Sequence, residues 1–524
     1  MSVVSKPPAS ALSALTPPRR APTNVGLDLA FVLATAMLVG LAILTKSLFL
    51  GVFLAVPILY IVLFILVRRP VWTFAFALIV QHFSGLIKEL TNFNQIGYFI
   101  QDGTFLIVLV PLILRRVLNG SQPNRSRHAW TAIDTFIVLY IALNLVCAFN
   151  PASPSPWLVL AAVRVRLLPL MMYFFVLYIT REGVELERPL FFVMATCTLC
   201  GAIFGLYESA IGIGGVQRLG PGFWPHQVSR VWQDAHGGEH FRPPGIYSDA
   251  GIAVLVAGMF AFMALLRPPM LKSGAAKAFV AVALLLSVVE IVATGSRSGF
   301  LAVAAAFIFL ALWKRSRVLT AALIGLPVVL GIALLIQPQI LDRYATILNP
   351  AQAYSQNRGY TNVTMLNELK SQPMGFGTGT ATEGAAKVAD LLKIDATADS
   401  GTTKNDNGWA NLLHEMGVAG VLVYLVLLVG IFSMGLRASR LLAPAKAYLA
   451  ATLVVWTVIA FVSTIGFVIT DVFPINVYFW SLLALVVSEG NRRQKALEAR
   501  RPKAEPRVLA TAGGFVPAPV GERR

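Results

Sequence analysis

The residues that could do chemistry in this chain are mainly arginines with few acidic residues nearby. Arg242 lies in FRPPGIYSD, Arg297 in ATGSRSGF, and Arg358 opens the stretch RGYTNVTMLNELK. A guanidinium never deprotonates in proteins and binds phosphate oxygens through paired hydrogen bonds. If these side chains converge, they predict a binding site for a phosphate or pyrophosphate. The alternative is that they anchor the chain at lipid headgroups, and composition alone does not choose between the two.

Two further arginines lie inside an apolar run. Arg164 and Arg166 occur in WLVLAAVRVRLLPL. A charge within a membrane segment is costly, so it is a functional hypothesis by default. We therefore predict that both contribute to substrate binding. The alternative is that their long side chains reach the headgroups of the nearer leaflet.

A carboxylate precedes another long apolar run. Asp406 and Asn407 lie in NDNGWANLLHEMG, where a helix is expected to begin. Asp and Asn are favoured helix N-caps. A carboxylate at this position could also act as a general base toward a substrate hydroxyl. Capping and catalysis both remain open for Asp406.

Metal and cofactor motifs are weak. One polar stretch contains several potential ligands: His226, Asp234, His236, Glu239 and His240. Their spacing does not match an established zinc motif, and HExxH is absent. The expected role of these histidines is that of solvated loop residues, with a metal site as the minor alternative. No cofactor and no metal is predicted.

The cysteines and the glycine-rich run also favour structural roles. Cys147, Cys197 and Cys200 all lie in apolar segments, where cysteine usually packs as a small apolar residue. The CxxC spacing of the last two would need further ligands to hold zinc. GFGTG does not follow a predicted strand, so it is not a dinucleotide fingerprint. A tight turn or a close approach of two backbones is expected there.

The elements that position these residues are membrane helices. The chain is 56% hydrophobic and only 13% charged, with a mean hydropathy of +0.71. A water-soluble protein of 524 residues could not cover its surface with so few charges. The net charge of +18 invites a nucleic-acid partner, but the basic residues lie in short segments between apolar runs. That distribution is typical of the positive-inside rule, so no nucleic acid is expected.

The apolar runs predict an all-α polytopic membrane protein with about fourteen transmembrane helices. The predicted spans are residues 27–45, 48–67, 71–90, 95–114, 130–149, 157–180, 189–210, 249–266, 278–295, 297–313, 319–337, 409–434, 447–469 and 473–489. With the amino terminus in the cytoplasm, every inner segment is basic. Both termini are therefore expected to be cytoplasmic.

The predicted spans divide the chain into a bundle with two tails. Residues 1–26 and 491–524 are expected to be disordered and cytoplasmic, and residues 27–490 form the bundle. Two outer loops, about 211–248 and about 338–408, are long enough to be functional. Within the second loop we expect a re-entrant or membrane-surface helical subdomain around Arg358 and the glycine-rich run that starts at Pro373. No apolar run beside a small-residue cleavage site occurs near the amino terminus, so no cleaved signal peptide is expected.

Four segments on the predicted outer side share an order with known motifs. They are RPPG from Arg242, TGSRSG around Arg297, NR at Arg358 followed by PMGFGTG, and DNGWANLLHEMGVAG from Asp406. In that order they resemble the R-x-x-G, S-R-[SG], R…P-x-x-G-x-G and H-N-x-Y-L-x-x-x-x-E-x-G-x-x-G motifs of the bacterial O-antigen ligase and O-antigen polymerase family. The motifs run from residue 242 to 420, and the helical arrangement extends the resemblance over most of the chain.

The resemblance implies a GT-C-like glycosyltransferase architecture with a large periplasmic helical loop, in the bacterial inner membrane. It also implies a metal-independent enzyme that moves glycan from a polyprenyl diphosphate carrier at the periplasmic face. Its partners would then be the lipid-linked oligosaccharide, membrane lipid, and a flippase and chain-length regulator of the same pathway.

The same resemblance implies roles for particular residues. Arg297 and Arg358 would stabilise the departing diphosphate together with Arg242, and Asp406 would accept the proton of the attacking hydroxyl beside Asn407. Ligases of the family have His where Asp406 stands, and His414 is not an obvious substitute because it lies deeper in the helix. This departure favours chain polymerisation over transfer to lipid A core or protein.

A lipid-linked oligosaccharide flippase is the rival from another functional class. Such a transporter is expected to carry charges along a central cavity and to show paired broken helices. Here the charges that can be placed within apolar runs gather near one end, as with Arg164 and Arg166, and no internal repeat is evident. The sequence therefore favours a transferase over a transporter.

Overall fold

The computed structural model describes most of the chain after residue 68. The described residues are 69–118, 131–153, 155–223, 231–233, 239–266, 270–314, 367, 370–382, 407–466 and 468–500. Arg358, Asp406 and the predicted spans 27–45, 48–67 and 319–337 lie outside these residues, as do the expectations attached to residues 1–26.

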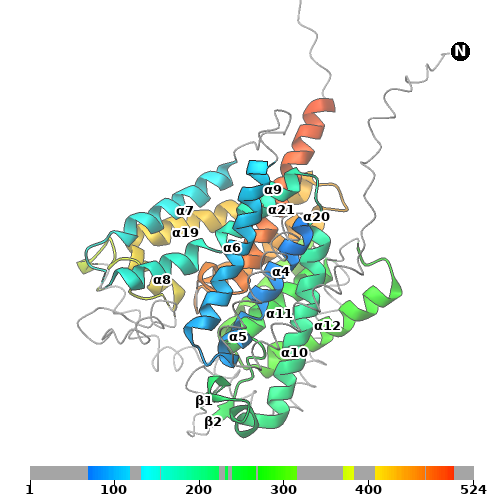
Figure 1. Ribbon diagram of the computed structural model, residues 1–524. Coiled ribbons are helices and arrows are strands. Elements are labelled where there is room, and N and C mark those ends of the chain that lie inside the picture. Colours follow the sequence, from blue (N-terminus) through cyan, green and yellow to red (C-terminus); the bar gives the residue numbers. More distant parts are fainter. Residues whose placement is uncertain are drawn as a thin grey trace, which may run out of the picture. The chain divides into compact units, whose positions relative to one another are not determined.

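Helices dominate the described part of the chain (Figure 1). In its first half they are α4 (Pro70–His82), α5 (Ser84–Leu90), α6 (Gln95–Leu118), α7 (Ala132–Ala148), α8 (Pro156–Leu167), α9 (Leu170–Arg181), α10 (Glu187–Gln217) and the 3₁₀ turn η1 (Pro221–Phe223). Two short strands follow, β1 (Val231–Gln233) and β2 (Glu239–Phe241). The remaining elements are α11 (Ala250–Leu265), α12 (Gly274–Ala293), α13 (Arg297–Lys314), α19 (Gly408–Leu441), α20 (Ala447–Ser463), the 3₁₀ turn η4 (Ile469–Asp471) and α21 (Ile475–Arg500).

The predicted spans that fall in the described residues coincide with helices. The span predicted over 71–90 is a bent pair, since α4 and α5 meet at 53°. The span predicted over 157–180 is α8 followed by α9, with Pro169 directly before α9. Proline removes a backbone donor and fixes φ, which explains why the helix is interrupted at this point.

Within the described residues, five helical segments are long and apolar enough to cross a membrane, or six if α4 and α5 form one span. They are Pro156–Arg181, Glu187–Gln217, Gly274–Ala293, Arg297–Lys314 and Gly408–Leu441. Four shorter apolar helices are Ile96–Val110, Ala132–Ala148, Ala250–Leu265 and Ala447–Ser463. The protein is thus an all-α polytopic membrane protein in its main features, while the predicted number of about fourteen spans is not confirmed.

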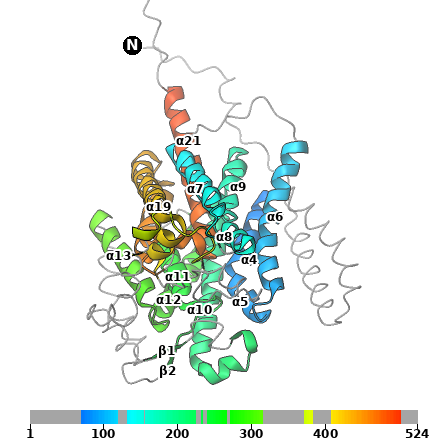
Figure 2. The ribbon, with the colours of Figure 1, turned by 90° about the vertical axis from the view of Figure 1, so that its left-hand side faces the viewer.

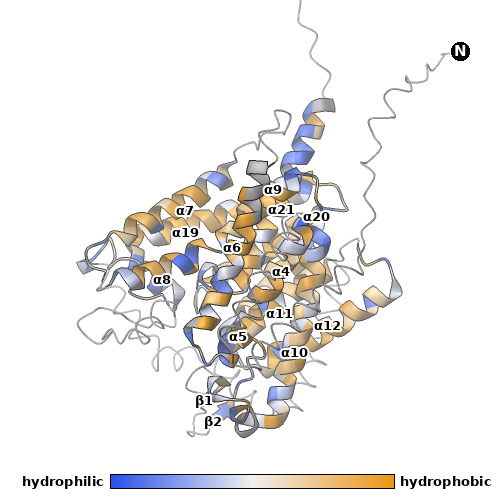
Figure 3. Ribbon diagram, viewed as in Figure 1, coloured by the Kyte–Doolittle hydropathy of each residue, from blue (hydrophilic) through white to orange (hydrophobic). Residues whose placement is uncertain are grey.

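The centre of the bundle is α11, which is apolar on every side. All residues from Ala250 to Ala264 are buried, as expected for a helix surrounded by others. The indole nitrogen of Trp456 on α20 donates a hydrogen bond to the Met259 carbonyl at 2.9 Å. The outer helices expose large apolar side chains such as Leu285, Ile308 and Val429. Figure 3 shows this apolar character along the helices, with polar residues gathered toward helix ends and connecting segments. Such a surface suits lipid.

Two local features concern the predicted loop 211–248 and the predicted C-terminal tail. The predicted loop 211–248 contains an antiparallel pair of short strands in which Trp232 faces His240. Figures 1 and 2 place these strands beside the far end of α10 and away from the C-terminal end of α21. Residues 491–500, which were expected to be disordered, continue α21 as a polar helix. Their alternation of charged and helix-favouring residues explains this continuation.

Candidate functional site

The first two predicted arginine motifs meet at the turn between α12 and α13. Arg242 Nε donates to the carbonyl oxygen of Thr294 at 3.5 Å, a long hydrogen bond. Gly295 has a positive φ of 60°, which lets the chain reverse between the two helices. Arg297 then begins α13. Residues 55 positions apart in sequence are therefore neighbours in the fold.

The amino-terminal end of α19 lies at the same end of the bundle. The turn after α20 touches both helices: a Cβ at Gly466 would lie 3.3 Å from the Cβ of Ser298 on α13. The carbonyl oxygen of Thr464 in the same turn accepts a hydrogen bond from the backbone N–H of Trp409 on α19 at 3.3 Å. The starts of α13 and α19 thus flank one turn. This arrangement brings Arg297 and Asn407 to the same end of the bundle.

Asn407 is the N-cap of α19. Its side-chain oxygen accepts hydrogen bonds from the backbone N–H groups of Trp409 and Ala410, at 3.0 and 3.4 Å. The sequence assigned the capping alternative to Asp406, whereas the structure gives the cap to the next residue. Asn and Asp are similarly favoured at this position, so the choice depends on backbone geometry rather than on residue type.

Replacing Asn407 tests whether its cap matters more than any contact with substrate. Asn407→Ser keeps a capping oxygen and should retain activity, while Asn407→Ala should lower stability by about 0.5–2 kcal/mol because the cap is lost. The measurements are thermal unfolding of the detergent-solubilised protein and glycan transfer. If Asn407→Ser is as stable as the original chain but inactive, the amide itself contacts substrate.

Arg164 and Arg166 occupy different environments although they are two residues apart on α8. Arg164 is about one quarter exposed and pairs with Asp102 of α6, with Nη1 3.0 Å from Oδ2. Its guanidinium also lies 5.9 Å from the centre of the Tyr98 ring. Arg164 therefore remains accessible from outside the bundle, as a substrate-binding role requires.

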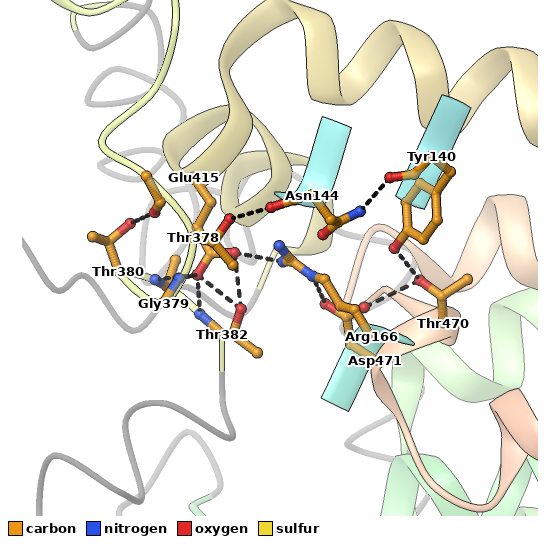
Figure 4. A network of polar contacts seen from close by, with 12 residues as sticks. Tyr140, Asn144, Arg166, Thr378, Gly379, Thr380, Thr382, Glu415, Thr470 and Asp471 are labelled. Carbon is orange, nitrogen blue, oxygen red and sulfur yellow. Dashed lines mark hydrogen bonds and ion pairs between the residues drawn. The ribbon is translucent and has the colours of Figure 1, made fainter. Parts of the chain in front are cut away.

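Arg166 is completely buried between two carboxylates (Figure 4). Its Nη2 lies 2.5 Å from Glu415 Oε2 on α19, and its Nε donates to Asp471 Oδ2 in η4 at 3.0 Å. Burial raises the pKa of the Asp471 carboxyl above its ordinary value, and the Arg166 guanidinium opposes that rise. Two carboxylates of the protein thus engage the Arg166 guanidinium, and its predicted substrate-binding role stays a prediction.

Glu415 joins this ion pair to the glycine-rich run. Its Oε1 accepts hydrogen bonds from the backbone N–H groups of Gly379, Ala381 and Thr382, at 3.0, 2.8 and 2.7 Å. The Thr382 hydroxyl donates to the same carboxylate at 2.8 Å. A buried carboxylate is tolerated only when it is paired and hydrogen-bonded in this way. We call Arg166, Glu415 and Asp471 the buried ionic bridge.

The glycine-rich run fits into a break in α19. The helix is interrupted at Gly417, whose φ of 62° lies in the left-handed region. The run supplies partners for backbone groups of α19 on both sides of the break. Phe376 N–H donates to the His414 carbonyl at 2.7 Å, and Val418 N–H donates to the Pro373 carbonyl at 3.1 Å. A Cβ at Gly417 would overlap that Pro373 carbonyl. The expected close approach of two backbones is therefore observed, and it explains the glycine.

Sequence reasoning missed two further buried carboxylates. Glu208 of α10 accepts a hydrogen bond from Gly245 N–H at 2.8 Å, and so holds the end of the segment that starts at Arg242. Glu290 of α12 is 1% exposed, and a Cβ at Gly245 would lie 3.1 Å from its Oε1. The signal was present, because an acidic residue in an apolar run marks a functional or structural site. The same signal marks Asp471 in IGFVITDVFPIN.

The possible metal ligands are not brought together in the described residues. His226, Asp234 and His236 lie outside them, while Glu239 and His240 lie on β2. Within the part of the chain that the structure describes, no group of three or more His, Cys, Asp or Glu residues could hold a metal ion. Cys147 and Cys197 are buried and Cys200 is exposed, each with a free thiol.

Comparison with known proteins identifies the central part of the chain. Residues 282–425 match a family model described as O-antigen ligase. The match includes Arg297, Arg358 and Glu415, whereas Arg166 and Asp471 lie outside it. A comparison with curated protein sequences gave no match. The match confirms the resemblance to the O-antigen ligase family for residues 282–425, which include the motifs from Arg297 onward, while the Arg242 motif lies before the matched segment.

Proposed function

We propose that the protein is a polysaccharide polymerase of the bacterial inner membrane. It would transfer glycan from a polyprenyl diphosphate carrier to the end of another lipid-linked repeat at the periplasmic face, in O-antigen or exopolysaccharide synthesis. The main observation in support is that Arg242, Arg297 and Asn407 lie at the same end of the bundle. The matched O-antigen ligase family supports a lipid-linked glycan as substrate.

The end of the bundle where α13 begins suits a diphosphate. The first turn of α13 contains no acidic residue, and its backbone N–H groups carry the positive end of the helix dipole. Arg297 is the first residue of that turn, and Arg242 lies against the preceding turn. Positive groups placed where charge develops stabilise a transition state. They would therefore favour departure of the lipid diphosphate.

The proposed step breaks one bond and forms one. The bond between the anomeric carbon and the diphosphate oxygen breaks, and its electron pair leaves with the diphosphate. The acceptor hydroxyl oxygen forms the new glycosidic bond, and its proton passes to the Asp406 carboxylate. Arg358 would join Arg242 and Arg297 on the diphosphate. The roles of Asp406 and Arg358 derive from the motif resemblance, since both residues lie outside the described part of the chain.

Transfer to lipid A core or to protein is the second candidate function, because the matching family is described as O-antigen ligase. Asp406 in place of the histidine of ligases favours polymerisation.

Purified protein supplied with a lipid diphosphate oligosaccharide separates these functions. We expect lipid-linked chains to lengthen by whole repeats, with release of the carrier diphosphate. Glycan found on added lipid A core or protein instead would identify a ligase. Movement of the intact lipid-linked oligosaccharide across a vesicle membrane, without any new glycosidic bond, would identify a flippase and contradict the proposed chemistry.

A further inference from the structure

The buried ionic bridge joins three elements that are distant in the sequence. Arg166 is on α8, Glu415 lies in the part of α19 before its break, and Asp471 ends η4. Arg166 and Glu415 side chains have no exposed surface, and that of Asp471 is 12% exposed. A buried charge is tolerated only beside its partner charge, so the bridge constrains the relative positions of α8, α19 and η4.

Two of these elements reach the candidate site directly. Residues 408–416 of α19 begin at the Asn407 cap, and Glu415 is near their inner end. The connection between α20 and α21 contains Thr464 and Gly466, which contact Trp409 and Ser298, and it also contains Asp471 at the end of η4. Arg166 therefore ties the first part of α19 to the segment that contacts the start of α13.

We propose that Arg166, Glu415 and Asp471 are positioning residues, whose bridge holds the Asn407 end of α19 and the Thr464–Asp471 segment in register beside Arg297. This inference rests on the proposed glycan transfer for its effect on rate. The structural part of it, that the bridge fixes the two segments, stands on the contacts alone. None of the three side chains is assigned a contact with substrate.

The contacts explain why arginine is required at the centre. The guanidinium presents several N–H donors in a planar fork, so Nε can engage Asp471 while Nη2 engages Glu415. A lysine at this position would keep the charge, but its single ammonium group cannot hold both carboxylates in the same geometry. Arg166→Lys is therefore a milder test than Arg166→Ala, which leaves two buried carboxylates without a cation.

A pair of cysteines reports the geometry without any glycan chemistry. In a chain whose three native cysteines are replaced by alanine, Ser298→Cys and Gly466→Cys would place two Cβ atoms 3.3 Å apart. This separation is close to the range of about 3.5–4.5 Å found in disulfides. The rate of disulfide formation under a mild oxidant then reports how often the start of α13 and the 464–471 segment lie within bonding distance.

The experiment combines this cross-link with transfer kinetics on the full-length protein without the added cysteine pair. We expect Arg166→Lys and Asp471→Asn to slow the cross-link and to lower kcat about 10- to 100-fold, since misplacement by about 1 Å can cost that much. KM for the lipid-linked donor should stay within about twofold, because the bridge does not touch substrate. Asp471→Asn retains the Arg166–Glu415 pair and provides a variant expected to fold if Arg166→Lys does not.

Lys446→Ala is the matched control. It removes the ion pair with Glu187 at the other end of α20, so the cross-link rate and kcat should not change. If Arg166→Lys and Asp471→Asn cross-link and turn over as the original chain does, the inference is wrong. A fall in kcat without a slower cross-link would also overturn it. An original chain that cross-links but transfers no glycan would refute the proposed function, and the cross-link comparison would still decide whether the bridge fixes the two segments.

Discussion

Arg297→Ala is expected to abolish polymer while the protein still accumulates in the membrane. Arg297 is partly exposed at the first turn of α13, beside the turn that Arg242 contacts. Removing one preorganised group that stabilises developing charge typically costs about 10²–10³ in rate. Arg297→Lys keeps the charge and loses the planar fork, so an intermediate rate is expected. The measurement is polysaccharide length on gels, together with the amount of membrane protein.

Arg218→Ala is the control for a general effect of positive charge. Arg218 is exposed at the end of α10 and takes no part in the candidate site, so its loss should leave polymer length unchanged. Arg358→Ala, placed in the same role by its motif, should abolish polymer as Arg297→Ala does. Full-length polysaccharide from both variants would show that the site has been assigned to the wrong residues.

Gly417→Ala is expected to disrupt the contact between the break in α19 and the glycine-rich run. At a φ of 62° and a ψ of −160°, a region that is essentially restricted to glycine, an alanine costs about 1–3 kcal/mol for the backbone conformation alone. Its Cβ would also overlap the Pro373 carbonyl oxygen, so the glycine-rich run would have to move away from α19. That movement would break the hydrogen bonds from Gly379, Ala381 and Thr382 to Glu415. We therefore expect a lower melting temperature and no transfer.

Gly490→Ala provides the comparison for this substitution. Gly490 lies within α21, and a Cβ there would meet no atom within 4 Å. Alanine in a helix interior is favoured over glycine by about 0.5–1 kcal/mol. Thermal unfolding of both variants in the same detergent checks the pair. A Gly417→Ala protein as stable and as active as the Gly490→Ala protein would contradict the proposed role of the helix break.

The sequence predicted the helices well because membrane burial imposes long apolar runs. The junction at Thr294–Arg297 was visible as a short polar interruption between two such runs, and it is a turn in the structure. The interruptions inside helices were harder to predict. Gly417 lies between HEM and the apolar run that starts at Val418, and glycine is common in transmembrane helices, so the local pattern does not mark a break there.

The site was only partly predictable for a related reason. Arg166 was recognised as costly, yet its partner Asp471 is 305 residues away, and no local periodicity connects the two. Glu415 stood in a recognised motif without a role, because its function depends on N–H groups of a distant loop. The cap at Asn407 rather than Asp406 shows the same limit at short range, since helix ends are uncertain by a residue or two.

The distance between Arg166 and Asp471 also bears on how the protein is made. The ribosome adds about 5–20 residues per second, so Asp471 emerges roughly 15–60 s after Arg166. During that interval the nascent α8 carries an arginine whose insertion costs about 2.5–3.5 kcal/mol at a helix centre, without either carboxylate to offset it. Biogenesis of the bundle is therefore complete only after its last connecting turn has been synthesised.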